Sequence, residues 1–298
     1  MAKYLYYPGC SQKASSRPYE KAFLAVCSKL GVELEEIDDW NCCGATMAVS
    51  CNKLLSLCLP ARNLARAEAL DLPVVTPCPS CWLSFKRVNK VFQDDRPLAE
   101  QVQGALSEAN ATYQGTAVVR HALDFFLNEV GLEAIRQKVS APLKGVKIAP
   151  YYGCQIVRPY GEGADAQNPQ GLERIIHALG GESVDFPHRT SCCGSSLMAT
   201  SKAIADGLCL RILDSIVKAG ADVTVTPCGL CQVNLELAQR SSRSVLKRPM
   251  SMGVLNLAQL VGLALGLTPS DLGVVGAPLG GKKTRMNTAE RVGVTSVN

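Results

Sequence analysis

Ten of the fourteen cysteines fall into two sets of five that have the same order and nearly the same spacing. In each set one cysteine follows an aromatic pair, two adjacent cysteines precede a glycine, and a Cys-x-x-Cys motif begins thirty-five positions after the second of them. Because order and spacing repeat together, the sequence predicts two copies of one metal-cluster module. The predicted ligands are Cys10, Cys42, Cys43, Cys78 and Cys81 in the first copy and Cys154, Cys192, Cys193, Cys228 and Cys231 in the second.

Thiolates bind soft metals, and the predicted positions of these cysteines favour ionisation. Each Cys-x-x-Cys motif follows a predicted strand, residues 73–76 or 223–226, and leads into a predicted helix. A thiol at a helix N-terminus meets the positive end of the helix dipole, which lowers its pKa. Gly44 and Gly194 follow the paired cysteines and let the backbone pass close to a bulky cofactor.

The number of ligands separates the metals that such a site could hold. A structural zinc ion and a regular four-iron cluster each take four protein ligands. Each set here offers five, and two adjacent residues rarely reach two corners of one small tetrahedron, so a larger or less symmetric iron–sulfur assembly is favoured. Zinc, or a regular cluster with one bystander cysteine, stays open as the alternative. A disulfide framework is disfavoured, because such frameworks are typical of short secreted chains.

The elements expected around the cysteines alternate between strands and helices in both copies. This pattern predicts an α/β fold of two duplicated modules related by pseudo-twofold symmetry, each with a small, mostly parallel sheet. We expect a first module at 1–143, a second at 144–267 and a flexible, basic tail at 268–298. The expected strands are 3–7, 32–37, 73–76, 146–152, 183–186 and 223–226, and the expected helical regions are 18–30, 45–70, 81–92, 121–130, 172–179, 197–218 and 250–266.

Composition excludes several classes of protein. The chain has 298 residues, 47% of them hydrophobic, and a mild net charge of +5 without a basic stripe interleaved with aromatics, so we expect no nucleic-acid partner. No apolar run reaches the roughly 20 residues of a membrane span. The run from 254 to 267 is short and contains Asn256 and Gln259. With no apolar leader after Met1 and so many cysteines, we expect a cytoplasmic protein.

The cysteine pattern resembles the cysteine-rich Cys-Cys-Gly domain, and residues 1–265 are similar to the B subunit of heterodisulfide reductase. The resemblance implies that each set of five cysteines binds a noncubane [4Fe-4S] cluster, and that the two clusters face a shared cavity. It implies cleavage or formation of a small disulfide there, with a small thiol or a carrier-bound dithiol as the reaction partner. It also implies two protein partners, a C-like iron–sulfur subunit that donates electrons and an A-like flavin-containing subunit.

Two further functions remain open. The chain has no ferredoxin signature C-x₂-C-x₂-C-x₃-C-P and no G-x-G-x-x-G loop, so we expect no flavin or nucleotide site in it. Electrons must then come from a separate subunit. Relatives with the same domain serve in dehydrogenases, so the chain could instead relay electrons to a quinone or carrier without disulfide chemistry. A zinc-stabilised scaffold is the third possibility.

Other residues carry weaker signals. Arg17 and Arg158 each follow the first cysteine of a set by a few positions, and His188 and Arg189 precede the second Cys-Cys-Gly motif. These four side chains are candidates to bind an anionic substrate, with a turn or helix-start role as the alternative. Trp40 borders the first motif and either shields the cluster or fills the core. We expect structural roles for the remaining cysteines and for two lone histidines, namely Cys27, Cys51, Cys58, Cys209, His121 and His177.

Overall fold

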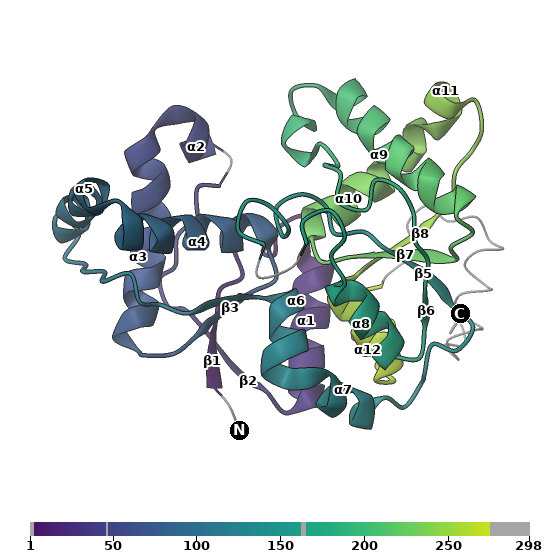
Figure 1. The fold of residues 1–298 in the computed structure, drawn as a ribbon, viewed down its shortest axis with the longest axis horizontal. Helices are drawn as coiled ribbons and strands as arrows, with labels where there is room; N and C mark the ends of the chain where they lie inside the picture. Colours follow the sequence, from purple (N-terminus) through teal and green to yellow (C-terminus); the bar gives the residue numbers. More distant parts are fainter. Residues whose placement is uncertain (1–2, 46, 162–164, 275–298) are drawn as a thin grey trace.

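The computed structural model describes residues 3–45, 47–161 and 165–274, and in these residues the strands form two four-stranded parallel sheets (Figure 1). The strand orders, β2-β1-β3-β4 and β6-β5-β7-β8, are equivalent, so the predicted duplication and α/β class are confirmed. The strands are β1 (Lys3–Tyr6), β2 (Glu33–Glu36), β3 (Val74–Thr76), β4 (Val119–His121), β5 (Lys147–Pro150), β6 (Glu182–Ser183), β7 (Val223–Thr226) and β8 (Gly253–Asn256).

Helices cover both faces of each sheet. Around the first sheet lie α1 (Arg17–Leu30), α2 (Met47–Cys51), α3 (Lys53–Ala69), α4 (Pro79–Asp94), α5 (Arg96–Ser107), α6 (Ala122–Asp124), the π-helix η1 (Phe125–Gly131) and α7 (Leu132–Lys138). Around the second lie α8 (Gly171–Ala178), the 3₁₀ helix η2 (Ser195–Leu197), α9 (Lys202–Lys218), α10 (Gly229–Ala238), the 3₁₀ helix η3 (Gln239–Ser241), α11 (Ser242–Leu246) and α12 (Leu257–Ala264).

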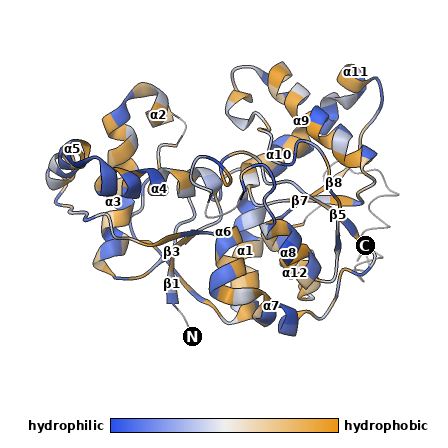
Figure 2. Ribbon diagram, viewed as in Figure 1, coloured by the Kyte–Doolittle hydropathy of each residue, from blue (hydrophilic) through white to orange (hydrophobic). Residues whose placement is uncertain are grey.

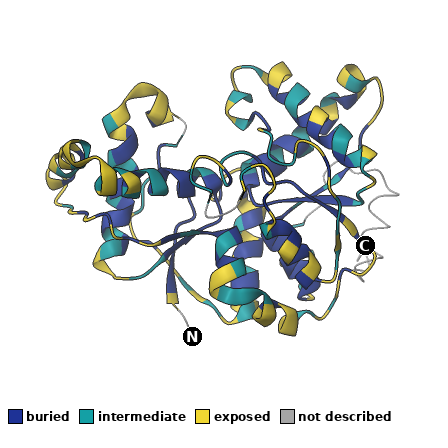
Figure 3. Cartoon of the chain, in the orientation of Figure 1, coloured by how far each residue is buried: buried dark blue, intermediate teal, exposed yellow. Residues whose placement is uncertain are grey.

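A central layer of helices separates the two sheets. Successive side chains of a strand point to opposite faces. Tyr4 and Tyr6 therefore pack into a core shared by both halves, whereas Leu5 and Tyr7 pack against the outer helices of the first half. Helices α1 and α12 meet in this shared core (Figure 1). Figure 2 shows hydrophobic residues along the strands and central helices, and Figure 3 shows the strands buried while the outer turns are exposed.

Two strands differ from the expected elements. Strand β4 ends at His121, where an amphipathic helix was expected to begin, and β8 occupies the start of the expected helix at 250–266. Each strand has only three or four residues and continues into a helix without a loop, so it leaves no separate period-2 signal. The helix expected at 197–218 is interrupted between η2 and α9, and α4 begins at Pro79 rather than at Cys81.

The packed part of the chain continues past the expected boundary at 267. Leu272 is fully buried in the shared core, and Thr268 and Asp271 form a hydrogen-bonded turn. Residues 275–298, most of the expected flexible tail, lie outside the described residues. Among the described helices, none combines the length and the apolar character that crossing a membrane requires.

Candidate metal centre

All ten motif cysteines lie at the carboxyl ends of parallel strands, the edge of an α/β sheet at which ligands bind. In the first half, Cys10 follows β1, the Cys42–Cys43 pair follows β2, and Cys78 follows β3. Because β2, β1 and β3 are neighbours in the sheet, three separate loops bring the first set together. The second half repeats this arrangement after β5, β6 and β7.

Sulfur–sulfur distances show that the cysteines gather without forming disulfides. In the first set Cys10 Sγ lies 3.8 Å from Cys42 Sγ, and Cys43 Sγ lies 3.4 Å from Cys81 Sγ. The matching pair in the second set, Cys193 and Cys231, is 3.3 Å apart. All fourteen cysteines belong to the described residues and all are free thiols, since a disulfide would join sulfurs at about 2.0 Å.

Each set combines three buried thiols with two at the rim. In the first half Cys43, Cys78 and Cys81 are buried, whereas Cys10 and Cys42 are exposed. In the second half the equivalent three are buried, Cys192 is exposed and Cys154 is partly exposed. A group held by such a set would be anchored on its inner side and reachable from solvent on its outer side.

A glycine before the first cysteine of each set leaves room for the thiols. Gly9 and Gly153 adopt φ values of 72° and 71°, which favour glycine. A β-carbon at Gly9 would lie 2.7 Å from Cys81 Sγ, and one at Gly153 would lie 3.2 Å from Cys231 Sγ. Each glycine thus allows its loop to cross directly over a buried sulfur.

Equivalent hydrogen bonds hold the Cys-Cys-Gly turn in both copies. The hydroxyl of Tyr7 donates to the Asn41 carbonyl at 2.8 Å, and that of Tyr151 donates to the Ser191 carbonyl at 2.8 Å. The Gly44 amide donates to Cys42 Sγ at 3.5 Å, and the Gly194 amide donates to Cys192 Sγ at 3.3 Å. Backbone N–H groups aimed at sulfur stabilise a thiolate.

Hydrogen bonds between neighbouring cysteines lower the pKa of some of their thiols. Hydrogen bonding to Cys154 lowers the pKa of Cys192 to about 6, and hydrogen bonding to Cys231 lowers the pKa of Cys193 to about 7. In the first copy, hydrogen bonding to Cys42 lowers the pKa of Cys43 well below its usual range. Both sets therefore contain sulfurs that ionise readily, as metal binding requires.

The donor sets suit an iron–sulfur group better than a single ion. Among the residues that the structure describes, no three His, Cys, Asp or Glu side chains surround one metal position. The sulfurs of the first copy instead pair up, Cys10 with Cys42 and Cys43 with Cys81, over an extended site. Five clustered, free sulfur donors in each half are consistent with iron–sulfur binding.

Sequence reasoning missed two asparagines that support these turns from behind, and it gave Cys209 only a general structural role. Asn234 on α10 and Cys209 on α9 both donate to the Cys193 carbonyl, at 2.6 and 3.1 Å. In the first half Asn63 on α3 accepts from the Asn41 amide at 2.9 Å and donates to the Asn41 carbonyl at 2.9 Å. Buried asparagines on otherwise apolar helix faces were the one signal in the sequence. Cys27 is buried in the shared core, Cys58 packs on the first core, and Cys51 is exposed.

Three of the four candidate substrate contacts are exposed. Arg17 donates to the Lys13 carbonyl at 2.9 Å, and Arg158 donates to the Thr190 carbonyl at 2.6 Å, so both also stabilise local turns. His188 has a φ of 72° and lies 3.3 Å from the Ser191 hydroxyl. Of the three, Arg158 and His188 lie beside the second Cys-Cys-Gly loop, and their substrate roles stay predictions.

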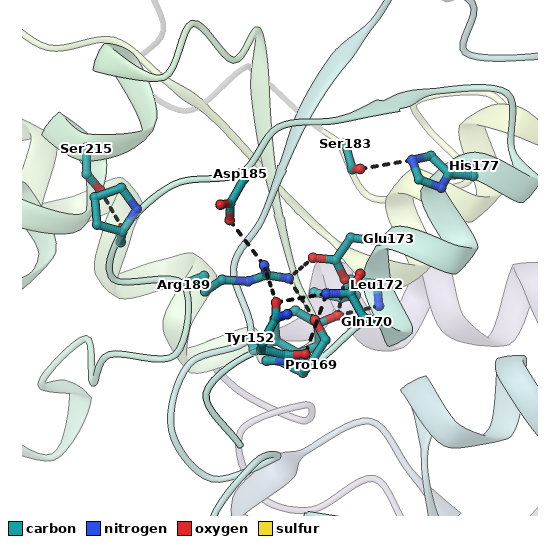
Figure 4. Close-up of polar contacts among 12 residues, drawn as sticks. Tyr152, Pro169, Gln170, Leu172, Glu173, His177, Ser183, Asp185, Arg189 and Ser215 are labelled. Atoms are coloured by element: carbon teal, nitrogen blue, oxygen red, sulfur yellow. Dashed lines mark hydrogen bonds and ion pairs between the residues drawn. The ribbon is translucent and has the colours of Figure 1, made fainter. Parts of the chain in front are cut away.

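Arg189, by contrast, is held inside the protein. Its guanidinium bonds to Glu173, to Asp185 at 3.1 Å and to the Pro169 carbonyl at 2.7 Å, and it packs over the ring of Tyr152 (Figure 4). Only 11% of its side chain is exposed. A substrate role for Arg189 would require it to leave both carboxylates.

The two cysteine sets meet through reciprocal contacts between the copies. Ser80, inside the first Cys-x-x-Cys motif, bonds to Gln155, the neighbour of Cys154. In return Tyr19 of α1 donates to the Pro227 carbonyl, and a β-carbon at Gly229 would lie 2.6 Å from Ser16 Oγ. Each first-cysteine loop therefore packs on the Cys-x-x-Cys turn of the other copy, as pseudo-twofold symmetry requires.

A comparison with known families also divides the chain into two matching copies. The model of the cysteine-rich domain, CCG, matches residues 4–86 and residues 148–236. The chain belongs to the CCG family. Both predicted copies of the CCG domain, and the resemblance to the B subunit of heterodisulfide reductase, are thereby confirmed.

Relatives of this CCG protein belong to more than one enzyme. It is 36% identical over 274 residues to the 8-methylmenaquinol:fumarate reductase membrane anchor subunit of Wolinella succinogenes, covering 91% of this chain and 95% of the relative. It is 30% identical over 279 residues to the B subunit of the ferredoxin/F420H2-dependent CoB-CoM heterodisulfide reductase of Methanosarcina acetivorans, covering 92% and 93%. The relatives are subunits of multi-subunit oxidoreductase complexes.

A solved structure shares the fold. The crystal structure of a hypothetical protein from Helicobacter pylori aligns with a TM-score of 0.74 at 13% identity and covers 94% of this chain. This chain spans only 52% of that structure's length. At this level of identity, the likeness supports the fold alone.

Proposed function

We propose that this CCG protein is the catalytic subunit of a heterodisulfide reductase-like complex that cleaves or forms a small-molecule disulfide. The observation that carries the proposal is the reciprocal packing of two complete cysteine sets, in which Ser80 of one motif contacts Gln155 beside the other. Cleavage of a disulfide yields two thiols and consumes two electrons and two protons. Two adjacent redox sites match a reaction that separates two sulfurs.

Each set of five thiols would hold one noncubane [4Fe-4S] cluster, which supplies or accepts electrons when bound. The three buried cysteines of a set would anchor it, and the two rim cysteines, Cys10 and Cys42 or Cys154 and Cys192, would face the substrate side. Arg158 and His188 lie exposed beside the second loop, where they would attract an anionic substrate. Two partners, one with iron–sulfur clusters and one with a flavin, would complete the electron path, and we place the complex in the cytoplasm.

A second function is a candidate because of one relative. The 36% identical protein is named as part of a menaquinol:fumarate reductase. The same paired sites could relay electrons between a quinol and a partner protein without disulfide chemistry. The two functions differ in whether a sulfur compound reaches the cysteine sets.

Spectroscopy of the anaerobically purified protein separates them. If the protein acts on disulfides, a thiol would reach the exposed side of the cysteine sets, so adding candidate thiols should change the electron paramagnetic resonance spectrum. The spectrum should respond to at least one thiol in a panel of anionic and lipoyl thiols, and should return when the thiol is removed. A spectrum that changes with a quinol and ignores every thiol would instead establish the relay function.

A further inference from the structure

The two copies differ at three equivalent positions next to their Cys-x-x-Cys motifs. One position directly follows the last cysteine of the motif. The second ends the fourth strand, pairs in register with Thr76 or Thr226, and caps the next helix. The third lies three residues further on. These positions are occupied by Trp82, His121 and Asp124 in the first copy and by Gln232, Asn256 and Gln259 in the second.

In the second copy the three side chains satisfy one another. Gln232 donates to Gln259 Oε1 at 2.9 Å, and Asn256 donates to Gln232 Oε1 at 3.0 Å. Asn256 and Gln259 also form a capping box at the start of α12. Each of the three is at least nine-tenths buried, so this polar triad is closed and complete.

In the first copy the side chains at the same positions do not hydrogen-bond to one another. Trp82 Nε1 and His121 Nε2 are buried and have no hydrogen-bond partner, two of the few such atoms among the described residues. Asp124 Oδ2 accepts no hydrogen bond from the described part of the chain either, and the oppositely charged Arg120 Nε lies 3.5 Å from it. Trp82 is 1% exposed and His121 is fully buried. Leaving a buried polar group without a partner is costly, so the two ring N–H groups need an explanation.

These three residues line one cleft of about 420 Å³ between the two halves of the chain. The apolar part of its wall comes from both halves, Leu123 and Leu127 from one and Ile156 and Val157 from the other. Tyr152, which the Arg189–Glu173 ion pair holds in place (Figure 4), also lines it. The cleft is therefore large enough and apolar enough for a small organic ring.

The unpaired atoms define what a ligand must offer. The indole N–H of Trp82 can only donate. Nδ1 of His121 accepts from the Leu123 amide at 3.1 Å, which leaves the proton on Nε2, and burial lowers the His121 pKa to about 3, so the ring is neutral. The carbonyls of Pro77 and Pro227 lie close enough to this ring to oppose part of that lowering of the pKa, but neither makes a well-formed hydrogen bond with Nε2. Asp124 Oδ2 can only accept, so a ligand that both accepts and donates can pair with the ring N–H groups and with this carboxylate.

The cleft has no excess of positive charge. Asp124, Asp165 and Arg174 line it, and the nearby Arg120 Nε lies 2.7 Å from Glu129 and 3.5 Å from Asp124 Oδ2. A site without excess positive charge favours a neutral ligand over the anionic compounds that the exposed arginines would attract. A ring hydroxyl meets both hydrogen-bonding needs, because its oxygen accepts while its proton is donated.

We propose that this cleft binds a neutral aromatic ring with hydroxyl oxygens, a compound of the quinol class. Its hydroxyl would accept from the Trp82 indole or the His121 ring and donate to Asp124. Since Trp82 directly follows Cys81, the ring would sit beside the first cysteine set. The inference concerns binding alone and holds for either candidate function.

The second copy provides the test, because its closed triad can be transplanted into the first. Isothermal titration of menadiol into the anaerobic, cluster-containing protein should show one site. The variant W82Q/H121N/D124Q should keep its iron content and fold and lose at least about tenfold in affinity. Trp82→Phe alone, which keeps the ring and removes the N–H, should lose up to about tenfold. Trp40→Phe is the matched control, since the Trp40 indole bonds to Glu36 at 2.8 Å.

Each outcome decides the matter. Should the transplanted variant misfold, Trp82→Phe and Asp124→Asn carry the test alone. Wild-type protein that fails to bind menadiol, or W82F and D124N proteins that bind it like wild type, would overturn the proposal. Displacement of menadiol by 2-mercaptoethanesulfonate would also overturn it, since the cleft would then be a thiol site. A protein that does not bind menadiol could still respond to thiols in the spectroscopic experiment. The ring-binding proposal and the disulfide proposal can therefore fail independently.

Discussion

The hydroxyl of Tyr19 donates a 3.2 Å hydrogen bond to the carbonyl of Pro227, 208 positions further along the chain. Tyr19 belongs to the helix of the first copy, and Pro227 directly precedes the first cysteine of the second Cys-x-x-Cys motif. Together with the Ser80–Gln155 contact, this bond fixes the position of each cysteine set with respect to the other copy.

Tyr19→Phe should therefore weaken the joint between the copies. The variant keeps the ring but leaves a buried carbonyl unpaired, so the free energy of unfolding should fall by about 1 kcal/mol. Tyr4→Phe is the comparison, because the Tyr4 hydroxyl bonds to Glu129 within the same half at 3.3 Å and is less enclosed. Denaturant titration of both variants measures the difference. Equal losses in the two variants would argue against a special role for the joint.

Gly9 should tolerate alanine worse than Gly153. Both residues have positive φ, but the added β-carbon would lie 2.7 Å from a sulfur at Gly9 and 3.2 Å at Gly153. We expect Gly9→Ala to cost at least about 2 kcal/mol and Gly153→Ala about 1 kcal/mol. Gly104→Ala lies inside α5 in open space and should stabilise the protein by about 0.5 kcal/mol. Thermal unfolding of the three variants tests the order, and a reversed order would contradict it.

Arg189 should matter for folding more than for substrate binding. Arg189→Met would leave the buried Glu173 carboxylate without its ion-pair partner, and breaking such a pair costs about 3 kcal/mol. Arg158→Met, at an exposed arginine of the preceding loop that donates to the Thr190 carbonyl, should change stability by less than about 1 kcal/mol. Denaturant titration gives both values. If R189M is as stable as R158M, Arg189 is free to contact a substrate after all.

The stability of the protein should depend on pH through Glu236. Burial raises the pKa of this carboxyl group on α10 to about 7. A raised carboxyl pKa means that ionisation opposes folding, so stability falls as pH rises from about 4.5, the unfolded value, to about 7. Glu236→Gln should therefore stabilise the protein by roughly 1–3 kcal/mol at pH 8 and have a much smaller effect near pH 5. Glu133→Gln, on the exposed side of α7, is the control, and an equal gain at both pH values would refute the assignment.

The sequence predicted the two matching cysteine sets better than it predicted their surroundings. Spacing alone paired Cys43 with Cys193 and Cys81 with Cys231, because a duplication preserves loop lengths. Strands β4 and β8 were not predicted, since each runs into a helix with no loop between. The Ser80–Gln155 and Tyr19–Pro227 contacts were beyond prediction, because they depend on how the copies pack and not on any local pattern.

The difference between the copies at Trp82 and Gln232 also required the structure. In the sequence both residues simply follow a cysteine. The unpredicted fourth strands bring His121 beside Trp82 in the first copy and Asn256 beside Gln232 in the second. Only these positions show that the second copy forms a complete polar triad, whereas the first has a cleft there.

Iron content in matched cysteine variants tests the central claim most directly. Protein purified without oxygen should contain about eight irons if each quintet holds a four-iron cluster. Cys43→Ser and Cys193→Ser should each lose about half of that iron, while Cys51→Ser, an exposed cysteine outside both sets, should lose none. Stoichiometric zinc in place of iron, or iron that is unchanged in both motif variants, would contradict the account.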